Sequence, residues 1–339
     1  MLTPQEVEGL FKIIDTLIKS GKSIIFITHK LKEVLAVADD ITVLRLGTVV
    51  GSIKPQDATS EILATMMVGR DVNLVVDKTP AKPAGAVLEV NNLYVRDERQ
   101  HLTVQGVSFD VRKGEVLGVA GVQGNGQTEL VYALTGLLPL ESGTIRLLDE
   151  AIHHTTPRNI LERGVAHIPE DRQRHGLILS FPIHDNLMLC TYYKQPFAKG
   201  ISLQPQPIFS NAEELVKQYD VRTPNIYVNA GTLSGGNQQK VIVAREFSRP
   251  IELLIASQPT RGLDVGSIEY IHKQIIKKRD EGTGVLLVSS ELDEILALSD
   301  RIAVMYKGQI MAIVDAKTAS KEQLGLLMAG MHPAESSKN

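Results

Sequence analysis

The alternation of apolar and polar residues in the middle of the chain predicts strands followed by a helix. The segments LEVNNLYV (88–95) and SFDVRKGEVLGVAG (108–121) are strand-like, and a turn near Gly114 divides the second one. Its apolar end, residues 116–120, runs directly into a glycine-rich loop. The segment ELVYALTGLL (129–138) then has the apolar spacing of a helix. The pattern predicts a strand, a loop and a helix in direct succession.

A second feature is an internal repeat, in which residues 20–51 match residues 281–312 with a shift of 261. The first copy reads SGKSIIFITHKLKEVLAVADDITVLRLGTVVG, and the second reads EGTGVLLVSSELDEILALSDRIAVMYKGQIMA. Identical residues at matching positions are Gly21 and Gly282, Leu31 and Leu292, Glu33 and Glu294, Leu35 and Leu296, Asp39 and Asp300, and Gly47 and Gly308. Each copy predicts a buried strand of β-branched residues, a helix, and a strand that ends in glycine. The repeat indicates two related domains.

The two copies of the domain do not begin at corresponding residues. Under the same shift Leu2 falls on Leu263, so the first copy starts where the second is already well advanced. We therefore expect residues 1–76 to be the carboxy-terminal remnant of one domain. The segment DKTPAKPAGA (77–86) is rich in proline and small residues and predicts an extended linker. The remaining boundaries that we expect are a second domain at 87–332 and a tail at 333–339.

Composition narrows the class of protein. At 339 residues the chain is long for a single domain, which agrees with two domains of roughly 100 to 200 residues or more. Hydrophobic residues make up 43% and charged residues 22%, as in soluble globular proteins. The formal net charge is −3 and no basic tail is present, so nothing indicates a nucleic-acid partner.

The sequence shows neither a membrane-spanning segment nor a signal peptide, which limits the expected cellular location. No apolar run reaches the roughly 18 to 20 residues needed to cross a bilayer, and the first residues do not have the pattern of a signal peptide. The single cysteine, Cys190, excludes an internal disulfide and fits a reducing compartment; we expect it to be a small buried residue rather than a reactive thiol. We expect a cytosolic protein that reaches any membrane through a partner.

The glycine-rich loop GVQGNGQT (121–128) carries the first candidate chemistry. It fits the phosphate-binding pattern G-x-x-x-x-G-K-[ST], except that Gln127 replaces the lysine. Its glycines allow successive backbone N–H groups and a helix N-terminus to face one anion, and Thr128 would offer its hydroxyl to Mg²⁺. Gln127 donates hydrogen bonds but carries no charge. Taken alone, the pattern does not separate a working site, a degraded site and a chance match.

The segment LSGGNQQK (233–240) is the second candidate for phosphate binding. A serine and two glycines precede the helical pattern VIVAREFSR (241–249), so a hydroxyl and bare amides can point toward a phosphate. The alternative is an ordinary helix cap in a glycine-rich loop, but the eight-residue string is more specific than a cap requires.

LSGGNQQK resembles the signature motif of the ATP-binding cassette (ABC) transporter ATPases, and the other motifs of that family occur in order around it. Residues 121–128 match the Walker A loop, and Glu170 in HIPEDR lies where the family has its Q-loop glutamine. LLIASQ (253–258) matches the Walker B strand, PTRGLD with Asp264 matches the D-loop, and Ser290 is at the switch-histidine position. The resemblance implies an α/β P-loop NTPase fold, with a RecA-like core, an antiparallel β subdomain and an α-helical subdomain at about 171–230.

Within this family the chain is most similar to the tandem-cassette importers of the ribose type, and in particular to their nucleoside branch, which works with BMP-type lipoproteins. The resemblance implies ATP and Mg²⁺ as cofactors, with Thr128 as a magnesium ligand. The nucleotide-binding positions that it implies are Gly121, Gln123, Gly124, Asn125, Gly126, Gln127, Thr128, Glu129, Ser234, Gly235, Gly236, Asn237 and Gln238.

Several family positions are altered in one expected pocket. Ser257 and Gln258 stand where the family has the aspartate that holds Mg²⁺ and the glutamate that activates water, and Ser290 replaces the histidine. With Gln127 in place of the lysine, these substitutions predict a site that binds nucleotide without efficient turnover. Loss of a general base alone commonly lowers a rate by a factor of about 10² to 10⁴, or about 3 to 5 kcal/mol.

The first copy keeps what the second has lost, since His29 aligns with Ser290 under the shift. In the family, two cassettes pair head to tail, and each ATP lies between the Walker motifs of one and the signature of the other. The resemblance therefore places His29 and the signature residues Ser234, Gly235 and Gly236 in one composite site that turns over ATP. The site built on Gln127 would be the silent one, and this chain alone is expected to be inactive.

The resemblance also implies partners: membrane permease subunits, another cassette (an intact first cassette or a second copy of this chain) and, indirectly, a solute-binding lipoprotein. It places the protein in the cytoplasm, peripherally on the inner face of the plasma membrane, as the ATP-binding subunit of a nucleoside or sugar importer. Residues 175–189, after the Q-loop, are expected to contact the membrane subunit or else to form an amphipathic core helix. Two alternatives remain open: a soluble tandem-cassette ATPase acting on ribosomes, and a regulatory module that binds nucleotide without hydrolysing it.

Overall fold

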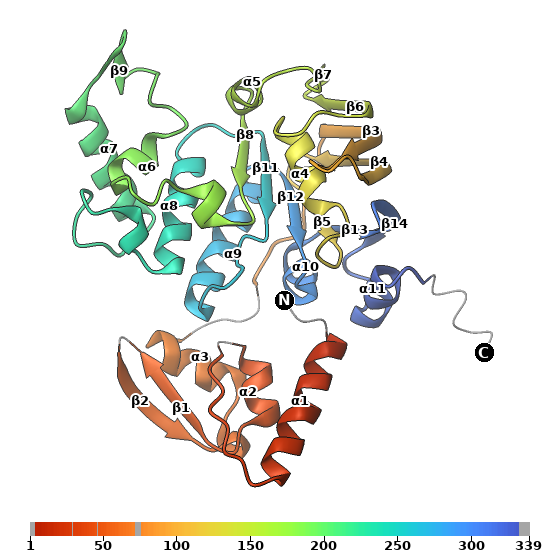
Figure 1. The fold of residues 1–339 in the computed structure, drawn as a ribbon. Helices are drawn as coiled ribbons and strands as arrows, with labels where there is room; N and C mark the ends of the chain where they lie inside the picture. The colour runs from red at the N-terminus through yellow and green to blue at the C-terminus, as the bar shows by residue number, and fades with distance from the viewer. Residues whose placement is uncertain (1–3, 29, 46, 72–75, 332–339) are drawn as a thin grey trace. The chain divides into compact units, whose positions relative to one another are not determined.

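The structure is a computed structural model that describes residues 4–28, 30–45, 47–71 and 76–331. The chain divides into two compact units (Figure 1). One comprises Met1–Val75 together with Asp264–Tyr270, and the other comprises Val76–Leu263 and Ile271–Asn339.

The second unit is built on a mostly parallel sheet. Strands β5 (Val116–Ala120), β12 (Gly284–Ser289), β11 (Leu253–Ser257) and β8 (Val165–Ile168) are parallel neighbours in that order. On the other side of β5 lies β13 (Arg301–Tyr306), also parallel, and then the antiparallel β14 (Gln309–Asp315). Every residue of β5, β11 and β12 is buried, as expected for strands covered on both faces.

An antiparallel sheet adjoins this core. Its strand order is β4 (Leu102–Arg112), β3 (Ala86–Arg96), β6 (Ser142–Leu147) and β7 (Glu150–Ala151). Helix α4 (Gln127–Leu134) packs against β3 and β4 on one side and β11 on the other, so both sheets share one apolar core. The strands, turn and helix predicted from the pattern of residues 88–138 are confirmed. Gly114 has φ +72°, which explains a glycine at the turn between β4 and β5.

Helices dominate the segment that follows β8. It contains a π-helical turn (Arg172–Gly176), α6 (Ile183–Met188), α7 (Pro205–Gln218) and a 3₁₀ turn (Ala230–Thr232), with a short hairpin of β9 (Ala198–Lys199) and β10 (Ser202–Leu203). The other helices of this unit are α5 (Pro157–Glu162), α8 (Gly235–Phe247), α10 (Leu292–Leu298) and α11 (Lys321–Met328). Helix α9 (Val265–Asp280) begins in one unit and ends in the other. In the part of the chain that the structure describes, each helix is too short or too polar to pass through a bilayer.

The first unit repeats the end of the second, element by element. Its elements are α1 (Pro4–Lys19), α2 (Leu31–Val37), β1 (Ile41–Arg45), β2 (Thr48–Ile53), a 3₁₀ turn (Pro55–Asp57) and α3 (Ser60–Val68). Shifted by 261, these helices and strands fall on α9, α10, β13, β14 and α11. The irregular pairing within the two hairpins also matches, since it lies at Val43 and Leu44 in β1 and at Val304 and Met305 in β13.

One predicted element of the repeat is wrong. Residues 24–28, the counterpart of β12, were expected to form a buried strand, but they have no regular structure, and Ile25 and Ile27 are each 92% exposed. The reason is the position of β12 between β5 and β11, which satisfy its backbone on both sides. Residues 4–28, 30–45 and 47–71 contain no counterpart of either neighbour. An apolar, β-branched sequence forms a strand only where partner strands exist.

Candidate functional site

The sequence motifs meet at one edge of the parallel sheet. Gly121 follows β5, Ser290 follows β12, Ser257 and Gln258 end or follow β11, and Glu170 follows β8. Because these strands are adjacent and parallel, their carboxyl ends lie side by side, where open α/β sheets bind their ligands. The fold therefore gathers the predicted positions from four separate segments.

Backbone geometry requires glycine at two points of the loop. Gly126 has φ +95°, and a Cβ there would lie 2.2 Å from the carbonyl oxygen of Thr103 on β4. A Cβ on Gly121 would lie 2.8 Å from the carbonyl oxygen of Met305 on β13. The loop thus packs closely against the backbone of both strands. Such a turn at a helix N-terminus can hold a phosphate.

The amide side chains of the loop have different surroundings. Gln127 is buried, and its Nε2 lies 2.4 Å from the position that a Cβ on Gly121 would take, so its side chain folds back over the loop. Asn125 accepts a hydrogen bond on Oδ1 from the backbone N–H of Lys307 at 2.9 Å, and its carbonyl accepts one from Gly308 at 3.0 Å. Asn125 therefore anchors the loop to the turn after β13. Gly124, at φ +90°, is exposed, and Glu129 is half-buried in the first turn of α4.

Glu170 is hydrogen-bonded to the loop through its carboxylate. Its carboxylate accepts hydrogen bonds from Gln123 Nε2 at 3.0 Å and from Thr128 Oγ1 at 3.1 Å, and it forms an ion pair with Arg261 at 2.6 Å. A threonine hydroxyl beside a carboxylate is a donor set that suits Mg²⁺. Within residues 4–28, 30–45, 47–71 and 76–331 no group of three or more His, Cys, Asp or Glu side chains is placed to hold a metal. Arg261 was not singled out from the sequence, although it lies in PTRGLD.

The substituted positions after β11 and β12 contact one another. Ser257 is buried, and Ser290 Oγ donates a hydrogen bond to Gln258 Oε1 at 3.3 Å. Gln258 has φ +47°, and its backbone N–H donates to the carbonyl of Val288 at 2.7 Å. An amide and a hydroxyl thus lie together at the ends of β11 and β12, and neither accepts a proton near neutral pH.

The turn that carries Ser290 is held in the same way in both copies of the repeat. Ser289 Oγ accepts from the backbone N–H of Glu291 at 3.1 Å, and Thr28 Oγ1 accepts from that of Lys30 at 3.1 Å. Thr28 Oγ1 also donates to Glu33 Oε2 at 3.3 Å. His29, which lies between Thr28 and Lys30 in the sequence, is outside the described residues.

Beneath Ser290 lies a buried carboxylate, Glu294. It accepts from Thr260 Oγ1 at 2.6 Å and contacts His272 Nε2 at 3.0 Å. Burial would raise the pKa of Glu294, but the hydrogen bonds and charge from His272, with hydrogen bonds from Ser289 and Thr260, lower it overall. Glu294 thus links the turn that carries Ser290 to α9 through His272, and to the segment that precedes Arg261 through Thr260.

The signature motif begins α8, with Ser234 as its N-cap residue and Gly236 buried. Asn237 donates from Nδ2 to Ser234 Oγ at 3.0 Å and accepts on Oδ1 from the backbone N–H of Arg222 at 2.8 Å. Gln238 is buried and donates to the carbonyl of Ala230 at 3.3 Å. The side chains of Asn237 and Gln238 thus hold the surrounding loops, and nucleotide binding by these two residues stays a prediction. Ser234, Gly235 and Gly236 form the turn itself, and Asp264 caps the start of α9 by accepting from the N–H of Ser267 at 2.9 Å.

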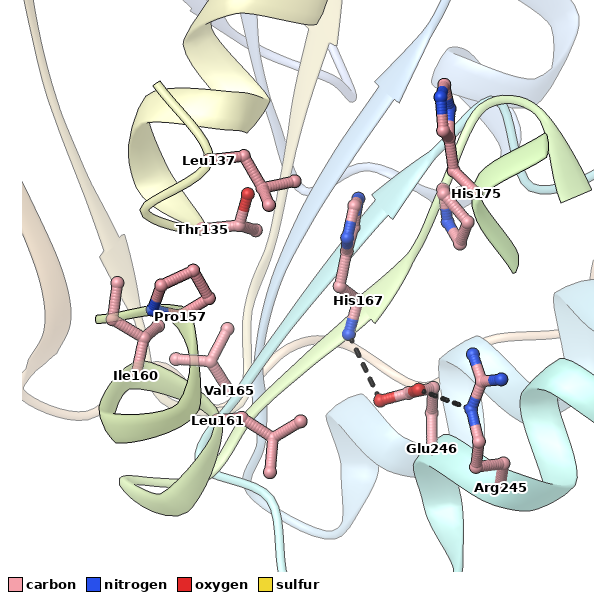
Figure 2. A pocket seen from close by; sticks show the side chains of 11 residues that line it. Thr135, Leu137, Pro157, Ile160, Leu161, Val165, His167, His175, Arg245 and Glu246 are labelled. Carbon is pink, nitrogen blue, oxygen red and sulfur yellow. Dashed lines mark hydrogen bonds and ion pairs between the residues drawn. The ribbon is translucent and has the colours of Figure 1, made fainter. Parts of the chain in front are cut away.

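A separate cavity of about 170 Å³ lies where α5, β8, the π-helical turn and α8 meet (Figure 2). Most of its lining is apolar, but Glu246 on α8 holds a charged cluster at one side. Glu246 is paired with Arg245 and Arg249, each at 3.0 Å, and accepts a hydrogen bond from the N–H of His167 at 3.4 Å. Burial opposes ionisation of Glu246, but the two arginines lower its pKa overall.

Cys190 contacts the same carboxylate. Its Sγ donates to Glu246 Oε1 at 3.4 Å, and burial, followed by the charge of Glu246, raises the pKa of the thiol to about 11. A thiol with this pKa is protonated at neutral pH and is a poor nucleophile, as expected for an unreactive cysteine.

His167 makes the stability of this region dependent on pH. Its Nε2 is buried and has no hydrogen-bond partner among the residues described, and burial lowers its pKa from 6.5 to about 4. Below pH 6.5 the unfolded chain binds a proton that the folded chain does not, so stability falls as pH drops from 6.5 toward 4. Between pH 7 and pH 5 we expect the free energy of unfolding, measured with urea, to fall by about 2 kcal/mol less in His167→Gln than in the wild type. Equal pH dependence in the wild type and the variant would contradict this.

Comparison with known proteins agrees with this geometry. The family model described as ABC transporter matches residues 104–261. The chain is 52% identical over 330 residues to the nucleoside import ATP-binding protein NupA of Lactococcus lactis, and 48% identical over 338 residues to the guanosine import ATP-binding protein NupO of Bacillus subtilis. These matches cover 97% and 100% of this chain but 65% and 66% of the two relatives. The chain thus spans about two thirds of their length.

Solved structures share the fold. The ADP conformation of MJ1267, an ATP-binding cassette of an ABC transporter, matches with a TM-score of 0.59 and 20% identity, over 75% of this chain and 98% of that one. A nucleotide-free ATP-binding cassette from an ABC transporter matches with a TM-score of 0.59 and 21% identity, over 72% of this chain and 96% of that one. The predictions of a P-loop NTPase fold and of an ABC cassette are therefore confirmed. This chain belongs to the ABC transporter family of ATP-binding proteins.

Proposed function

We propose that this chain is part of the ATP-binding subunit of an importer for nucleosides or, as the second choice, simple sugars. The observation that carries the proposal is the meeting of the glycine loop, Glu170, Gln258 and Ser290 at the ends of adjacent parallel strands. The relatives named for nucleoside and guanosine import favour nucleosides. A relative from Clostridium tetani named for ribose import, 36% identical over 95% of this chain and 63% of its own length, keeps simple sugars as the second choice.

In this proposal the glycine loop holds a nucleotide. The loop amides and the N-terminus of α4 would bind its phosphates, since backbone N–H groups and a helix dipole favour an anion. Thr128 and Glu170 would hold Mg²⁺, which supplies positive charge to the phosphates when it is bound. Glu170 then takes over the role of the carboxylate that Ser257 does not provide.

Turnover at this site would be slow. Gln258 cannot remove a proton from water, and its side-chain oxygen is already engaged by Ser290. Gln127 provides no charge where the family has a lysine. We infer that the site holds nucleotide and that closure around it, rather than hydrolysis, is its contribution.

The turnover site would be formed with a first cassette. Ser234, Gly235 and Gly236 would face the phosphates bound by that cassette, and His29 would contact the γ-phosphate. We assign residues 1–76 to the end of the first cassette, 77–86 to a linker, 87–332 to the second cassette with its helical subdomain at about 171–230, and 333–339 to a tail. Membrane permease subunits would be contacted near residues 175–189, which border the cavity of Figure 2 through His175. This places the protein at the inner face of the plasma membrane, with a solute-binding lipoprotein as an indirect partner.

Two other functions compete with this one. A tandem-cassette ATPase that acts on ribosomes would be expected to have intact Walker motifs and a long charged linker, whereas this chain has Gln127, Ser257 and Gln258 and a short linker. A regulatory module that never hydrolyses ATP would have the same second site but no turnover with the first cassette restored.

The proposal predicts a specific loss of uptake. Deleting the gene should abolish uptake of radiolabelled guanosine or another nucleoside and leave uptake of an unrelated amino acid unchanged. Complementation with the wild-type gene provides the control. Loss of ribose uptake alone would identify the sugar class instead. Unchanged uptake of nucleosides and of simple sugars would contradict the importer function.

A further inference from the structure

The ion pair between Glu170 and Arg261 joins the two ends of neighbouring strands β8 and β11. The guanidinium lies 2.6 Å from Glu170 Oε1, and Gln123 and Thr128 of the glycine loop bond to the same carboxylate. The side chains of Arg261 and Glu170 are 39% and 20% exposed, so the pair is partly open to solvent. One carboxylate thus separates an arginine from the glycine loop.

The charges of this site are unusual for a place that binds a polyphosphate. Gln127 leaves the loop without the cation that a phosphate loop ordinarily carries, and Glu170 adds an anion beside it. A nucleoside triphosphate bound at the loop would therefore have a carboxylate beside its phosphates. Either a cation must come from elsewhere in the chain, or the carboxylate must be neutralised before phosphate can bind.

We propose that Arg261 is the phosphate cation of this site, released from Glu170 when Mg-nucleotide binds. Glu170 exchanges its arginine for the magnesium ion, and Arg261 exchanges its carboxylate for phosphate oxygens. Each ion keeps a partner of opposite charge throughout, so the exchange leaves no buried charge unpaired. The inference rests on the proposed nucleotide site and adds the residue that replaces the missing lysine.

A neighbouring arginine holds the backbone of Arg261 independently of its side chain. Arg172 NH1 donates to the carbonyl oxygen of Arg261 at 2.7 Å. The Arg172 guanidinium also packs on the signature turn, where a Cβ on Gly235 would lie 2.7 Å from its NH2. Arg261 is therefore anchored through its main chain beside the loop. Arginine suits the exchange because its planar fork pairs equally well with a carboxylate and with phosphate.

A purely structural ion pair makes a different prediction. If Glu170 and Arg261 only fastened two loops together, removing either partner would loosen the same contact and change nucleotide affinity in the same direction. In the exchange proposed here the two residues act oppositely on metal-free nucleotide, because one is an anion and the other a cation beside the phosphates. The dependence of affinity on Mg²⁺ therefore separates the two roles.

The test is a titration of the full chain with ATP and with a fluorescent ATP analogue, in EDTA and in excess Mg²⁺. Glu170→Gln should raise the affinity for metal-free ATP about five- to tenfold and remove the gain from Mg²⁺. Arg261→Ala should lower the affinity for metal-free ATP about tenfold and enlarge the gain from Mg²⁺. Arg261→Lys should retain most of the affinity, and the double variant should lack the increase seen in Glu170→Gln.

The control is Arg174→Ala, which removes one positive charge from an exposed side chain of the π-helical turn and should leave both affinities unchanged. Thermal melting of each variant checks that it is folded. A fall in metal-free affinity in both single variants would overturn the exchange and leave a structural pair. A wild-type chain that binds no nucleotide in either condition would instead overturn the proposed nucleotide site, and this inference with it.

Discussion

Glu246→Ala is expected to destabilise the second unit by about 3 to 5 kcal/mol, measured as the free energy of unfolding in urea. Glu246 is 3% exposed and pairs with both Arg245 and Arg249, so its removal leaves two arginines without their shared counter-charge. Arg245 retains a hydrogen bond from NH1 to the carbonyl of Gly176 at 2.7 Å, but that oxygen carries no full charge. The same carboxylate also receives the N–H of His167 and the thiol of Cys190.

The matched control is Glu252→Ala, which breaks the ion pair between Lys113 and Glu252 at 2.6 Å. Its side chains are 40% and 44% exposed, and such surface pairs contribute about 0 to 1 kcal/mol. We expect the control to stay within 1 kcal/mol of the wild type. A loss of similar size in the two variants would show that the burial of Glu246 does not set its contribution.

Much of the fold could be predicted because its signals are local. The glycine loop and LSGGNQQK each lie in one short segment, and the strand before and the helix after them have clear apolar periods. The repeat added long-range information, since elements spaced by 261 residues recur in α1 and α9 and in the hairpins β1–β2 and β13–β14. Local pattern and repeat together were enough to indicate the family.

What failed depends on neighbours that a local pattern does not contain. Residues 24–28 have the composition of a strand, but their partners are not among the residues described, so Ile25 and Ile27 are exposed. Arg261 lies in PTRGLD, the motif in which Asp264 was matched to the D-loop. Its ion pair with Glu170 joins two distant segments and can be seen only in the fold. The motif predicts that Asn237 and Gln238 bind nucleotide, and that stays a prediction; their hydrogen bonds to Arg222 and Ala230 are contacts that a local pattern does not contain.

The second large effect concerns catalysis. The isolated chain is expected to bind Mg-ATP weakly and to hydrolyse it at a rate near background, because loss of the base alone lowers a rate by a factor of about 10² to 10⁴. Gln258→Glu by itself should raise the rate of hydrolysis by less than about tenfold. Gln127 and Ser257 remain unchanged, so the lysine and the aspartate that the family has at these positions are still missing. A variant with full turnover after this one substitution would show that only the base had been lost.

The most direct test measures binding and hydrolysis on the same sample. Radiolabelled Mg-ATP is incubated with the purified 339-residue chain, and bound nucleotide and released phosphate are quantified together over time. Gly126→Val serves as the control without a site, because a Cβ at φ +95° would collide with the carbonyl of Thr103. The account predicts saturable binding of ATP that Gly126→Val abolishes, with the bound nucleotide recovered as ATP. Robust turnover by the wild-type chain, lost in Gly126→Val, would contradict it.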